Sequence, residues 1–301
     1  MFKKLIFVGV ATLFTANCTL ANPDVKGLNI YQDDAMYKYF DAGKDLIDAD
    51  KVNCQYTNGS PANCETHLSP SFNWPKNSLE VTDKISRSGK LAFKFKNGPG
   101  DCGQHGTRPG SFDDCAKDRE RSEISMKSLM VGEKDMWFKF SIFIPEDTVF
   151  YHPIKYSLWQ IHSRKGPVNF QVAVNGRKEI VWSDHINNDW GYGTTNYKIL
   201  DASDLKGKWN DFIVHIQFKK NPNKGFVKVY ANGELKVNYT GKTENSLSRA
   251  NYMKFGIYKT YVSRYKGQRS AETVYYDAVG IGDNCKELDL ENEGYSCSDI
   301  K

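Results

Sequence analysis

Polar side chains alternate along several short segments of the sequence, a spacing that places them on one face of a β-strand. In the segment "DRERSEIS" this face carries Arg119, Arg121, Glu123 and Ser125. An arginine held by a carboxylate can bind an anion through charge-assisted hydrogen bonds, whereas an exposed ion pair of the same kind contributes little to stability. The segment therefore contains a candidate anion-binding arginine, with a surface ion pair as the ordinary alternative.

Two further segments carry side chains that can transfer protons. Gln160 and His162 share one face of "SLWQIHS", and Tyr252, Lys254 and Tyr258 lie opposite the apolar face of "NYMKFGIYKT". Histidine exchanges protons near neutral pH, and tyrosine, whose ordinary pKa is about 10, does so when nearby cations lower that pKa. Each pattern alone is common in structural strands. Together in one sheet, the three segments would form a site for acid-base chemistry on an anionic substrate.

The third segment also has a clear apolar face, which Met253, Phe255 and Ile257 form. We expect this face in the core. Gly256 lies between Lys254 and Tyr258 on the polar side. A glycine inside a strand marks either the close approach of a ligand or a bulge, and the sequence leaves both interpretations open.

Alternation of apolar and polar residues dominates the rest of the chain and predicts strands. Asn-Gly pairs at 175–176 and 232–233 predict hairpin turns, and helical periodicity is limited to short stretches near 34–49 and 201–205. Many regularly spaced strands with few helices predict an all-β, concanavalin-like β-jelly roll, a two-sheet antiparallel sandwich whose concave face suits an extended chain ligand. The predicted strands lie within residues 90–98, 118–125, 135–145, 156–163, 169–176, 178–184, 209–220, 225–239, 251–260 and 272–283.

The chain begins like a secretory signal peptide. Two lysines in "MFKK" precede the apolar run "LIFVGVATLF" and the small residues of "TLA", which is the order of charge, apolar core and cleavage site in such peptides. We predict that residues 1–21 are a signal peptide cleaved after Ala21, and that the mature protein is secreted or periplasmic. The apolar run is short for a permanent transmembrane helix and no later run equals it, so no membrane span is expected.

Export would permit disulfide bonds. Cleavage removes Cys18 and leaves an even number of the seven cysteines. Because six cysteines allow many connectivities, pairing between neighbours in the sequence is a preference rather than a deduction. The preferred pairs are Cys54 with Cys64, Cys102 with Cys115, and Cys285 with Cys297.

The mature chain of about 280 residues can bury one sizeable core. No linker, low-complexity tract or internal repeat divides it, so we predict a single domain over residues 22–301 that acts as a monomer. The formal net charge of the whole chain is +5, and it falls by two with the loss of Lys3 and Lys4. This mild, dispersed charge weakly favours an anionic polymer as partner and is not the footprint of a nucleic-acid-binding protein.

The three polar segments also resemble a known family. In the order "RSEIS", "QIHS" and "YMKFGIYKT" they are similar to the signature blocks of jelly-roll polysaccharide lyases, among which alginate lyases carry R-[ST]-E-[LV]-R, Q-[IV]-H and Y-F-K-A-G-x-Y-x-Q. With "GKWNDFIVHIQF", "GFVKVYANGELK" and "TVYYDAVGIG", the chain is more similar still to the heparin lyase I and glucuronan lyase-like group. The resemblance extends over residues 90–283, most of the mature chain.

The resemblance implies a lyase that removes the C5 proton of a uronic acid and breaks the bond at O4. Arg121 and Gln160 would neutralise the uronate carboxylate, with Glu123 orienting Arg121. His162 and Tyr258 would transfer the protons, and which of them is the base depends on the stereochemistry of the sugar. Cations would lower the pKa of Tyr258. The remaining substrate-binding candidates are Lys254, Arg119 and Tyr252.

The chain departs from the alginate lyase blocks at several positions. Ser125 replaces the second arginine, Phe255 replaces the alanine, and Lys259 and Thr260 replace the Asn-Gln pair. These departures argue against alginate more than against lyase chemistry. Heparin would call for denser clusters of Arg and Lys, so glucuronan or a related uronan is favoured, with alginate and heparin-type glycosaminoglycans still open.

Further candidate residues, for a metal ion and for the ends of a cleft, lie outside this predicted site. The chemistry requires no cofactor, and the resemblance allows a structural calcium ion near Asp277, although no spacing in the sequence demands a metal. Loop residues could form the ends of a cleft, with an ordinary solvated loop as the alternative. These residues are His105, Arg108, Tyr261, Arg264, Tyr265 and Lys266.

Two other functions compete with lyase activity. The segment "ELDLE" presents Glu287, Asp289 and Glu291 with the spacing of the carboxylates in jelly-roll glycoside hydrolases, but it follows the last predicted strand. A non-catalytic carbohydrate-binding module on the same sandwich would need exposed aromatic side chains for stacking, and its candidates are Trp74, Trp159, Trp182 and Trp190.

Overall fold

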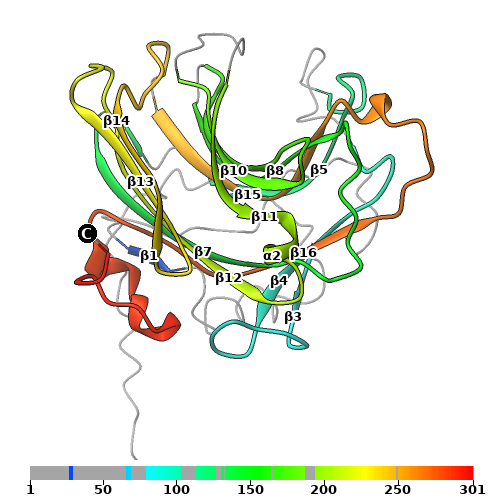
Figure 1. Cartoon of the computed structure of the whole chain (residues 1–301), viewed down its shortest axis with the longest axis horizontal. Helices are drawn as coiled ribbons and strands as arrows, with labels where there is room; N and C mark the ends of the chain where they lie inside the picture. Colours follow the sequence, from blue (N-terminus) through cyan, green and yellow to red (C-terminus); the bar gives the residue numbers. More distant parts are fainter. Residues whose placement is uncertain are drawn as a thin grey trace, which may run out of the picture.

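The computed structural model describes residues 27–29, 66–68, 79–102, 113–126, 130–131, 133–163, 166–186, 194–248 and 250–300. These residues form two stacked antiparallel sheets, which confirms the predicted all-β jelly-roll sandwich (Figure 1). The predicted signal peptide, the helical stretch at 34–49 and the Cys54–Cys64 pair lie outside the described residues.

The first sheet, called the outer sheet, has eight strands among the described residues. In spatial order they are β14 (Glu234–Gly241), β13 (Gly225–Ala231), β12 (Trp209–Gln217), β7 (Asp135–Phe143), β16 (Glu272–Gly282), β4 (Ala92–Asn97) and β3 (Leu79–Thr82), with β1 (Gly27–Asn29) also paired to β16.

The second sheet, called the inner sheet, has eight strands in the same part of the chain. Both sheets curve in the same direction, and the inner sheet forms the concave side (Figure 1). Its order is β11 (Thr195–Asp201), β10 (Glu179–Asp184), β9 (Val168–Val174), β8 (Lys155–Ser163), β15 (Ala250–Thr260), β5 (Arg119–Met126) and β2 (Thr66–Leu68), with β6 (Met130–Val131) also paired to β15.

The core lies between the two sheets and is rich in aromatic rings. Phe95 of β4 packs edge-on against Phe255 of β15, with ring centroids 5.7 Å apart, and against Tyr276 of β16 at 5.3 Å. Trp159 of β8 stacks on Phe140 of β7 at 5.2 Å. Because each of these rings lies on the inward side of an alternating strand, the polar side chains between them face outward.

The predicted strands are confirmed, and so is the short helix near 201–205, which is α2 (Ala202–Leu205). The turn at Asn232 and Gly233 links β13 to β14, and both residues have positive φ, as a two-residue hairpin loop requires. Five strands, β1, β2, β3, β6 and β11, were not predicted. In β11 only Ile199 is buried among mostly exposed neighbours, so this edge strand lacks the alternation that reveals strands.

The C-terminal segment packs against the outer sheet. It contains two 3₁₀ helices, η3 (Cys285–Leu288) and η4 (Leu290–Glu293), and Leu288 and Leu290 are buried against Ile213 and Tyr230. Glu287, Asp289 and Glu291 therefore do not share the face of a strand. The arrangement that a jelly-roll hydrolase would need is absent from this segment.

Two of the three predicted disulfides are present in the structure. Cys102 is bonded to Cys115, and Cys285 is bonded to Cys297. The first bond lies in the segment that precedes β5. The second bond lies in the C-terminal segment that follows β16. Within the described residues, no helix is long and apolar enough to cross a membrane.

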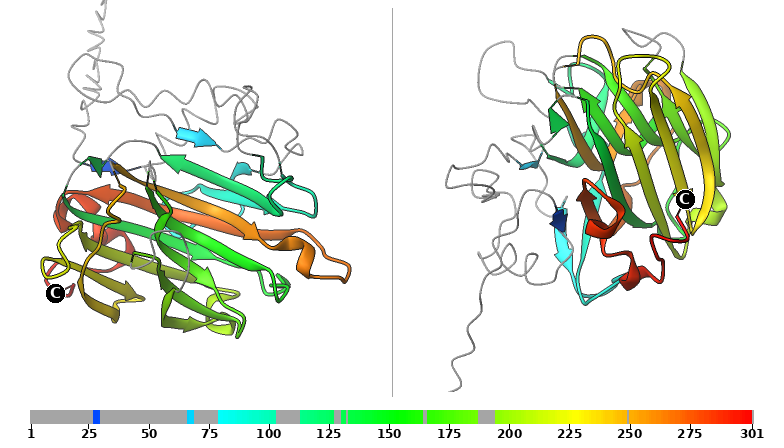
Figure 2. Two further views of the ribbon diagram at one scale, coloured as in Figure 1. Left: turned by 90° about the horizontal axis from the view of Figure 1, so that it is seen from above. Right: turned by 90° about the vertical axis from the view of Figure 1, so that its left-hand side faces the viewer.

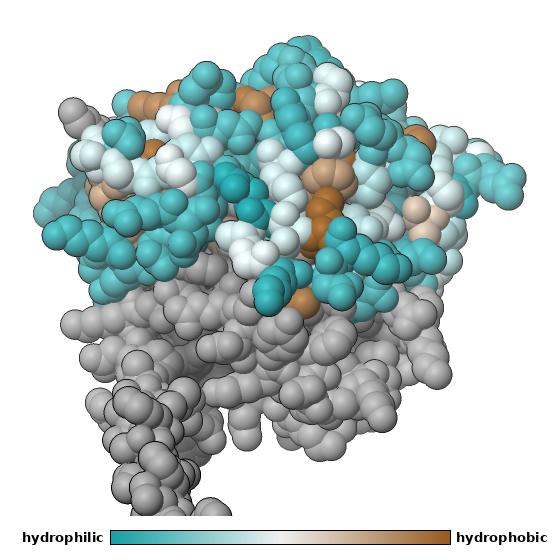
Figure 3. Space-filling model, turned by 90° about the horizontal axis from the view of Figure 1, so that it is seen from below, coloured by the Kyte–Doolittle hydropathy of each residue, from teal (hydrophilic) through white to brown (hydrophobic). Residues whose placement is uncertain are grey.

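The faces of the molecule differ in character. Seen from above, β15 runs between its neighbours across the concave side (Figure 2). On the opposite side, seen from below, the coloured residues are mainly hydrophilic with narrow hydrophobic areas (Figure 3). The side chains that could perform chemistry gather on the concave inner sheet.

A bulge in β15 resolves the question of Gly256. The pairing of β15 with β8 shifts between Phe255 and Tyr258, and Gly256 has φ +130°. An added Cβ would lie 2.3 Å from the carbonyl oxygen of Ser122 and 3.0 Å from the Phe95 ring. The space that a side chain would need is filled by the protein, so the glycine serves the bulge rather than the approach of a sugar. The hydroxyl of Tyr276 lies 2.9 Å from the Gly256 carbonyl oxygen, to which it donates.

The substitution Gly256→Ala should destabilise the fold by about 3 kcal/mol or more, because it adds a steric clash to an unfavourable φ. Gly100→Ala is the matched control, since Gly100 also has positive φ (+85°) but no atom within 4 Å of an added Cβ. This control should lose only about 1 kcal/mol in urea denaturation. Equal losses of stability in the two variants would show that the clash with Ser122 of β5 does not contribute.

Candidate active site

The three polar segments predicted from the sequence are adjacent strands of the inner sheet. β15 pairs with β5 on one side and with β8 on the other. The register places Tyr258 opposite Arg121, Lys254 opposite Gln160, and Tyr252 opposite His162. The predicted assembly of these side chains on one face is therefore present in the structure.

Glu123 is the centre of this cluster. Its side chain is buried, with the whole residue 1% exposed, and it contacts a residue from each of the three strands. Oε2 accepts from Arg121 Nη1 at 3.0 Å and from Lys254 Nζ at 2.7 Å, and Oε1 accepts from the Gln160 amide. Burial alone would raise the pKa of Glu123, but the charges of Lys254 and Arg121 outweigh it and lower the pKa. Glu123 is thus a buried, ionised carboxylate that holds both cations in place.

Arg121 is held on both sides by carboxylates. Its Nε and Nη2 donate to Asp114 at 2.6 and 2.8 Å, in addition to the bond to Glu123. Burial opposes its charge, yet Glu123 and Asp114 raise its pKa above the ordinary value. A guanidinium has five N–H donors, so this arrangement fixes the side chain and leaves donors for a ligand.

Asp114 was not identified from the sequence. It precedes Cys115, which is bonded to Cys102 and lies shortly before β5 begins at Arg119. The neighbouring cysteine is the only signal that the sequence offered. A carboxylate in a predicted loop gives no indication that it will pair with an arginine on the following strand.

His162 lies at one end of the cluster, with its ring stacked on Tyr252 at a centroid distance of 5.3 Å. Burial, and then the charge of Lys254, lower the pKa of His162 to about 4. Its Nδ1 lies 2.7 Å from the Ser163 carbonyl oxygen. Because a carbonyl can only accept, Nδ1 carries the proton of the neutral ring, and Nε2 keeps its lone pair.

Tyr258 lies at the other end, beneath the guanidinium of Arg121. The Arg121 Cζ is 4.2 Å from the ring centroid, and Arg119 Cζ is 5.9 Å away. The sequence predicted that cations would lower the pKa of Tyr258. The structure contradicts this: burial raises the pKa, and the opposing effect of Arg121 and Arg119 is smaller. Tyr258 therefore carries its proton at neutral pH.

Lys254 has a pKa lowered to about 8, because burial and the charge of Arg121 together outweigh the attraction of Glu123. It is predominantly charged at neutral pH. Arg121, Lys254, His162 and Tyr258 thus combine two cations, one neutral base and one neutral acid on a single face. The charge of Arg121 acts to lower the pKa of both groups that could exchange protons, His162 and Tyr258.

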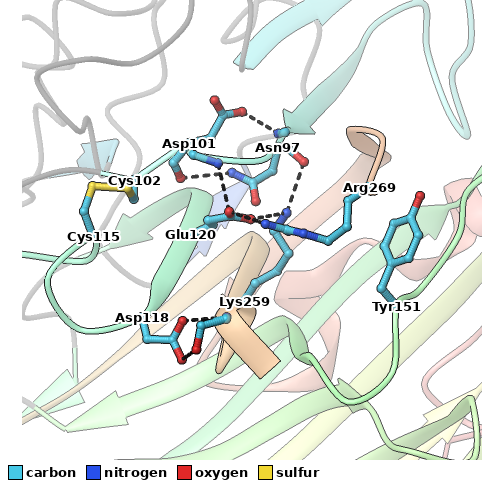
Figure 4. A network of polar contacts seen from close by, with 12 residues as sticks. Asn97, Asp101, Cys102, Cys115, Asp118, Glu120, Tyr151, Lys259 and Arg269 are labelled. Carbon is cyan, nitrogen blue, oxygen red and sulfur yellow. Dashed lines mark hydrogen bonds and ion pairs between the residues drawn. A yellow bond between two sulfur atoms is a disulfide. The ribbon is translucent and has the colours of Figure 1, made fainter. Parts of the chain in front are cut away.

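A second polar network, which includes Glu120, Lys259 and Arg269, lies on the inward side of β5 and β15 (Figure 4). Lys259, with 0% exposure, is 2.7 Å from Glu120 and 2.8 Å from Glu272 of the outer sheet. Arg269 forms two bonds of 2.7 Å with Glu120. Since Lys259 and Glu120 are opposite each other in register, next to the Tyr258 and Arg121 pair, this network fixes the alignment of β15 with β5.

The predicted ends of the cleft are only partly described. Tyr261 follows β15, is 40% exposed, and has Arg264 Cζ 3.8 Å and Lys155 Nζ 5.4 Å from its ring centroid. Tyr265 packs against Tyr151 instead, at 5.0 Å, and Lys266 is exposed. His105 and Arg108 lie outside the described residues.

Asp277, the residue near which a structural calcium ion was predicted, is bonded by backbone N–H groups. It is fully buried, and its carboxylate accepts from the backbone N–H groups of Arg87, Ser88 and Ala278 at 2.6 to 3.0 Å. The calcium ion near Asp277 stays a prediction. The described part of the chain does not bring three or more Asp, Glu, His or Cys side chains together in a group that could hold a metal ion.

The tryptophans give little support to a non-catalytic binding module. Trp159 and Trp182 are buried in the core at 0% and 1% exposure, so neither offers a ring for stacking on a sugar. Trp74 and Trp190 lie outside the described residues.

The fold and the cluster define a jelly-roll protein with acid-base side chains on its concave face. The sequence model of the polysaccharide lyase family matches residues 54–280, so this chain belongs to that family and is a polysaccharide lyase. No curated protein matches the chain by sequence.

A solved structure agrees with the fold, and a second one is reported for comparison. Endo-β-1,4-glucuronan lyase from the fungus Trichoderma reesei superposes with a TM-score of 0.55 at 15% identity, over 75% of this chain and 96% of that one. Alginate lyase A1-II′, a member of polysaccharide lyase family 7, gives a TM-score of 0.48 at 12% identity, over 70% of this chain and 85% of that one. At such identities the similarity to the glucuronan lyase establishes the fold alone.

The substitution Glu123→Gln should destabilise the protein by about 3 kcal/mol at neutral pH, because it leaves buried Lys254 without its counter-charge. The loss should shrink as the pH falls below 4.5, the ordinary pKa of glutamate, because the unfolded chain then binds a proton, and it should be gone only below the lowered pKa of the native side chain. Urea denaturation at several pH values measures the difference.

The matched control is Glu234→Gln, which removes an exposed carboxylate paired with Lys236. It should leave stability unchanged at every pH. A stability of Glu123→Gln equal to that of this control would contradict the central role of Glu123.

Proposed function

We propose that this polysaccharide lyase cleaves a uronic-acid polymer by β-elimination, with His162 as base and Tyr258 as acid. The observation that supports this most directly is the state of His162, whose half-buried, neutral ring donates from Nδ1 to the Ser163 carbonyl oxygen and retains a lone pair on Nε2. A base in this state, beside two cations, suits the removal of a proton from a carbon next to a carboxylate.

The first requirement of the reaction is to neutralise the uronate carboxylate, since its negative charge makes the C5 proton weakly acidic. Arg121 and Lys254 supply positive charge, and Gln160 can donate from its amide. As the C5 proton leaves, the electron pair moves into the carboxylate to give an enolate-like species. The same donors stabilise the charge that develops there.

Proton transfer completes the elimination. His162 Nε2 accepts the C5 proton, the C4–O4 bond breaks, and a double bond forms between C4 and C5. The departing O4 receives a proton from the Tyr258 hydroxyl, which is protonated because burial raises its pKa. Arg121, stacked on the Tyr258 ring, stabilises the phenolate that remains until solvent restores its proton.

We favour glucuronan or a related unsulfated uronan as the substrate. Two cations in the cluster balance two carboxylates, Asp114 and Glu123, so the site is suited to one carboxylate per sugar rather than to dense sulfation. The disulfides fit an oxidising compartment, and we propose that the protein is secreted or periplasmic. We propose that the reaction needs no metal.

The variants His162→Ala and Tyr258→Phe should each lower the rate of product formation by at least about 100-fold, because each removes a proton-transfer group. The assay follows the ultraviolet absorbance of the unsaturated product during incubation with glucuronan, alginate, heparin and heparan sulfate. His215→Ala and Tyr275→Phe, on the outer sheet, are the matched controls and should remain active.

Other outcomes of this assay identify other functions. New reducing ends without absorbance would indicate hydrolysis, and binding without any product would indicate a carbohydrate-binding role. Full activity of both site variants would overturn the assignment of His162 and Tyr258.

The pH dependence of kcat/KM should reflect the shifted pKa values of two groups, His162 and Lys254. Activity should fall at low pH as His162, with a pKa of about 4, is protonated and can no longer accept a proton. It should fall again above about pH 8 as Lys254 loses its charge. Lys254→Arg keeps the charge to higher pH and should move the alkaline limb upward. An alkaline limb that does not move in this variant would exclude Lys254 as its origin.

A further inference from the structure

The inner sheet continues beyond the proposed catalytic strands. β9, β10 and β11 extend it on the side of β8, and they carry polar side chains in register with the site. Lys254 is opposite Gln160, Gln160 is opposite Gln171, Gln171 is opposite Ser183, and Ser183 is opposite Asn196. We call these five residues the polar row. Four steps between strands span about 19 Å at 4.8 Å each.

The spacing of the polar row suits a polysaccharide that crosses the strands. The distance between neighbouring strands, about 4.8 Å, is close to the length of one pyranose unit in a 1,4-linked chain. Each strand can therefore present one side chain to each successive sugar. The first two members of the polar row, Lys254 and Gln160, belong to the proposed catalytic cluster, so Gln171 would meet a neighbouring sugar.

Gln171 is oriented by His185. The two side chains are 3.2 Å apart, between His185 Nε2 and Gln171 Oε1. Burial, and then the charge of Lys155, lower the pKa of His185 to about 4, so the ring is neutral and donates from Nε2 to the amide oxygen. The amide nitrogen of Gln171 makes no hydrogen bond to another described residue. It thus retains two donors, fixed in direction, on a half-buried side chain.

The positions next to the polar row are small. Opposite Tyr258 lies Ser157, and opposite Ser157 lies Ala173, on the same face of β8 and β9. Side chains of this size leave room above the sheet beside the longer amides. A sugar ring can therefore approach Gln171 from the side on which Tyr258 acts.

We propose that Gln171 and His185 form a binding subsite for the hydroxyl groups of the sugar attached to C1 of the cleaved uronate, so that the polymer runs along the polar row across β8, β9 and β10. This inference rests on the proposed function. It adds the path of the polysaccharide across the sheet and a residue that binds the hydroxyl groups of an unsulfated sugar. Ser183 and Asn196, bonded to each other at 2.8 Å, continue the row with neutral groups. Neutral donors and acceptors suit hydroxyl groups, whereas sulfate groups call for cations.

The test uses glucuronic acid oligomers of defined length with Gln171→Ala and His185→Ala. For the longest oligomers kcat/KM should fall about tenfold, mainly through KM, since a lost hydrogen-bonding subsite weakens binding. For the shortest oligomer that is cleaved, both variants should match the wild type, because that oligomer does not reach the subsite. Gln171→Glu should lose more with long oligomers, because its charge repels a uronate.

The matched controls are Gln217→Ala and His215→Ala on β12 of the outer sheet, which should behave as wild type at every length. An equal loss at all lengths, or no loss at any length, would overturn the subsite. Failure of the proposed function gives a different result, since the wild type would then form no unsaturated product. In that case calorimetric binding of the same oligomers to wild type and Gln171→Ala still decides on the subsite, and equal affinities would overturn it.

Discussion

The buried carboxylate of Glu123 is the interaction on which the concave face depends. Without it, Arg121 and Lys254 would be two cations close together in a poorly hydrated place, and each would oppose the charge of the other. With it, residues from β5, β15 and β8 meet at one point, and Gln160 is fixed by the same group. The arrangement has a cost, because burying charges is unfavourable unless all are paired. What it provides is a set of donors whose positions are fixed before a substrate arrives.

The side chains of this cluster meet only if the strands keep their register. Three inward-facing contacts maintain that register. Glu120 and Lys259 are opposite each other and buried, and the Lys259 ammonium also reaches Glu272 of the outer sheet. Tyr276 donates to carbonyl oxygens at the bulge beside Gly256. A slip of one residue would turn Lys259 toward solvent and Tyr258 into the core. The side chains that position the site are therefore on the opposite face from those that would perform the chemistry.

The sequence predicted the strands and the three polar segments because both depend on local alternation, which survives any tertiary context. It could not predict Asp114 or the pairing of Gln171 with His185, since these contacts join loops and strands whose order in the sheet is not encoded locally. The pKa of Tyr258 was predicted in the wrong direction for a related reason. Charged neighbours can be read from a sequence, but the burial that outweighs them depends on the packing of the whole sheet. The meaning of Gly256 also depended on what occupies the space around it.

The concave face is divided into two parts with different physical character. On β5, β15 and β8 the groups other than Gln160 are charged or titratable, and their burial sets which of them carry protons. On β9, β10 and β11 the polar row continues with an amide, a hydroxyl and a second amide, none of which titrates. Binding energy gained on neutral groups is insensitive to pH and to salt, whereas the charged part responds to both. A polymer held by the neutral part can present its carboxylate to the charged part in a fixed position, and this is how contacts remote from the reacting atoms can lower the barrier to chemistry.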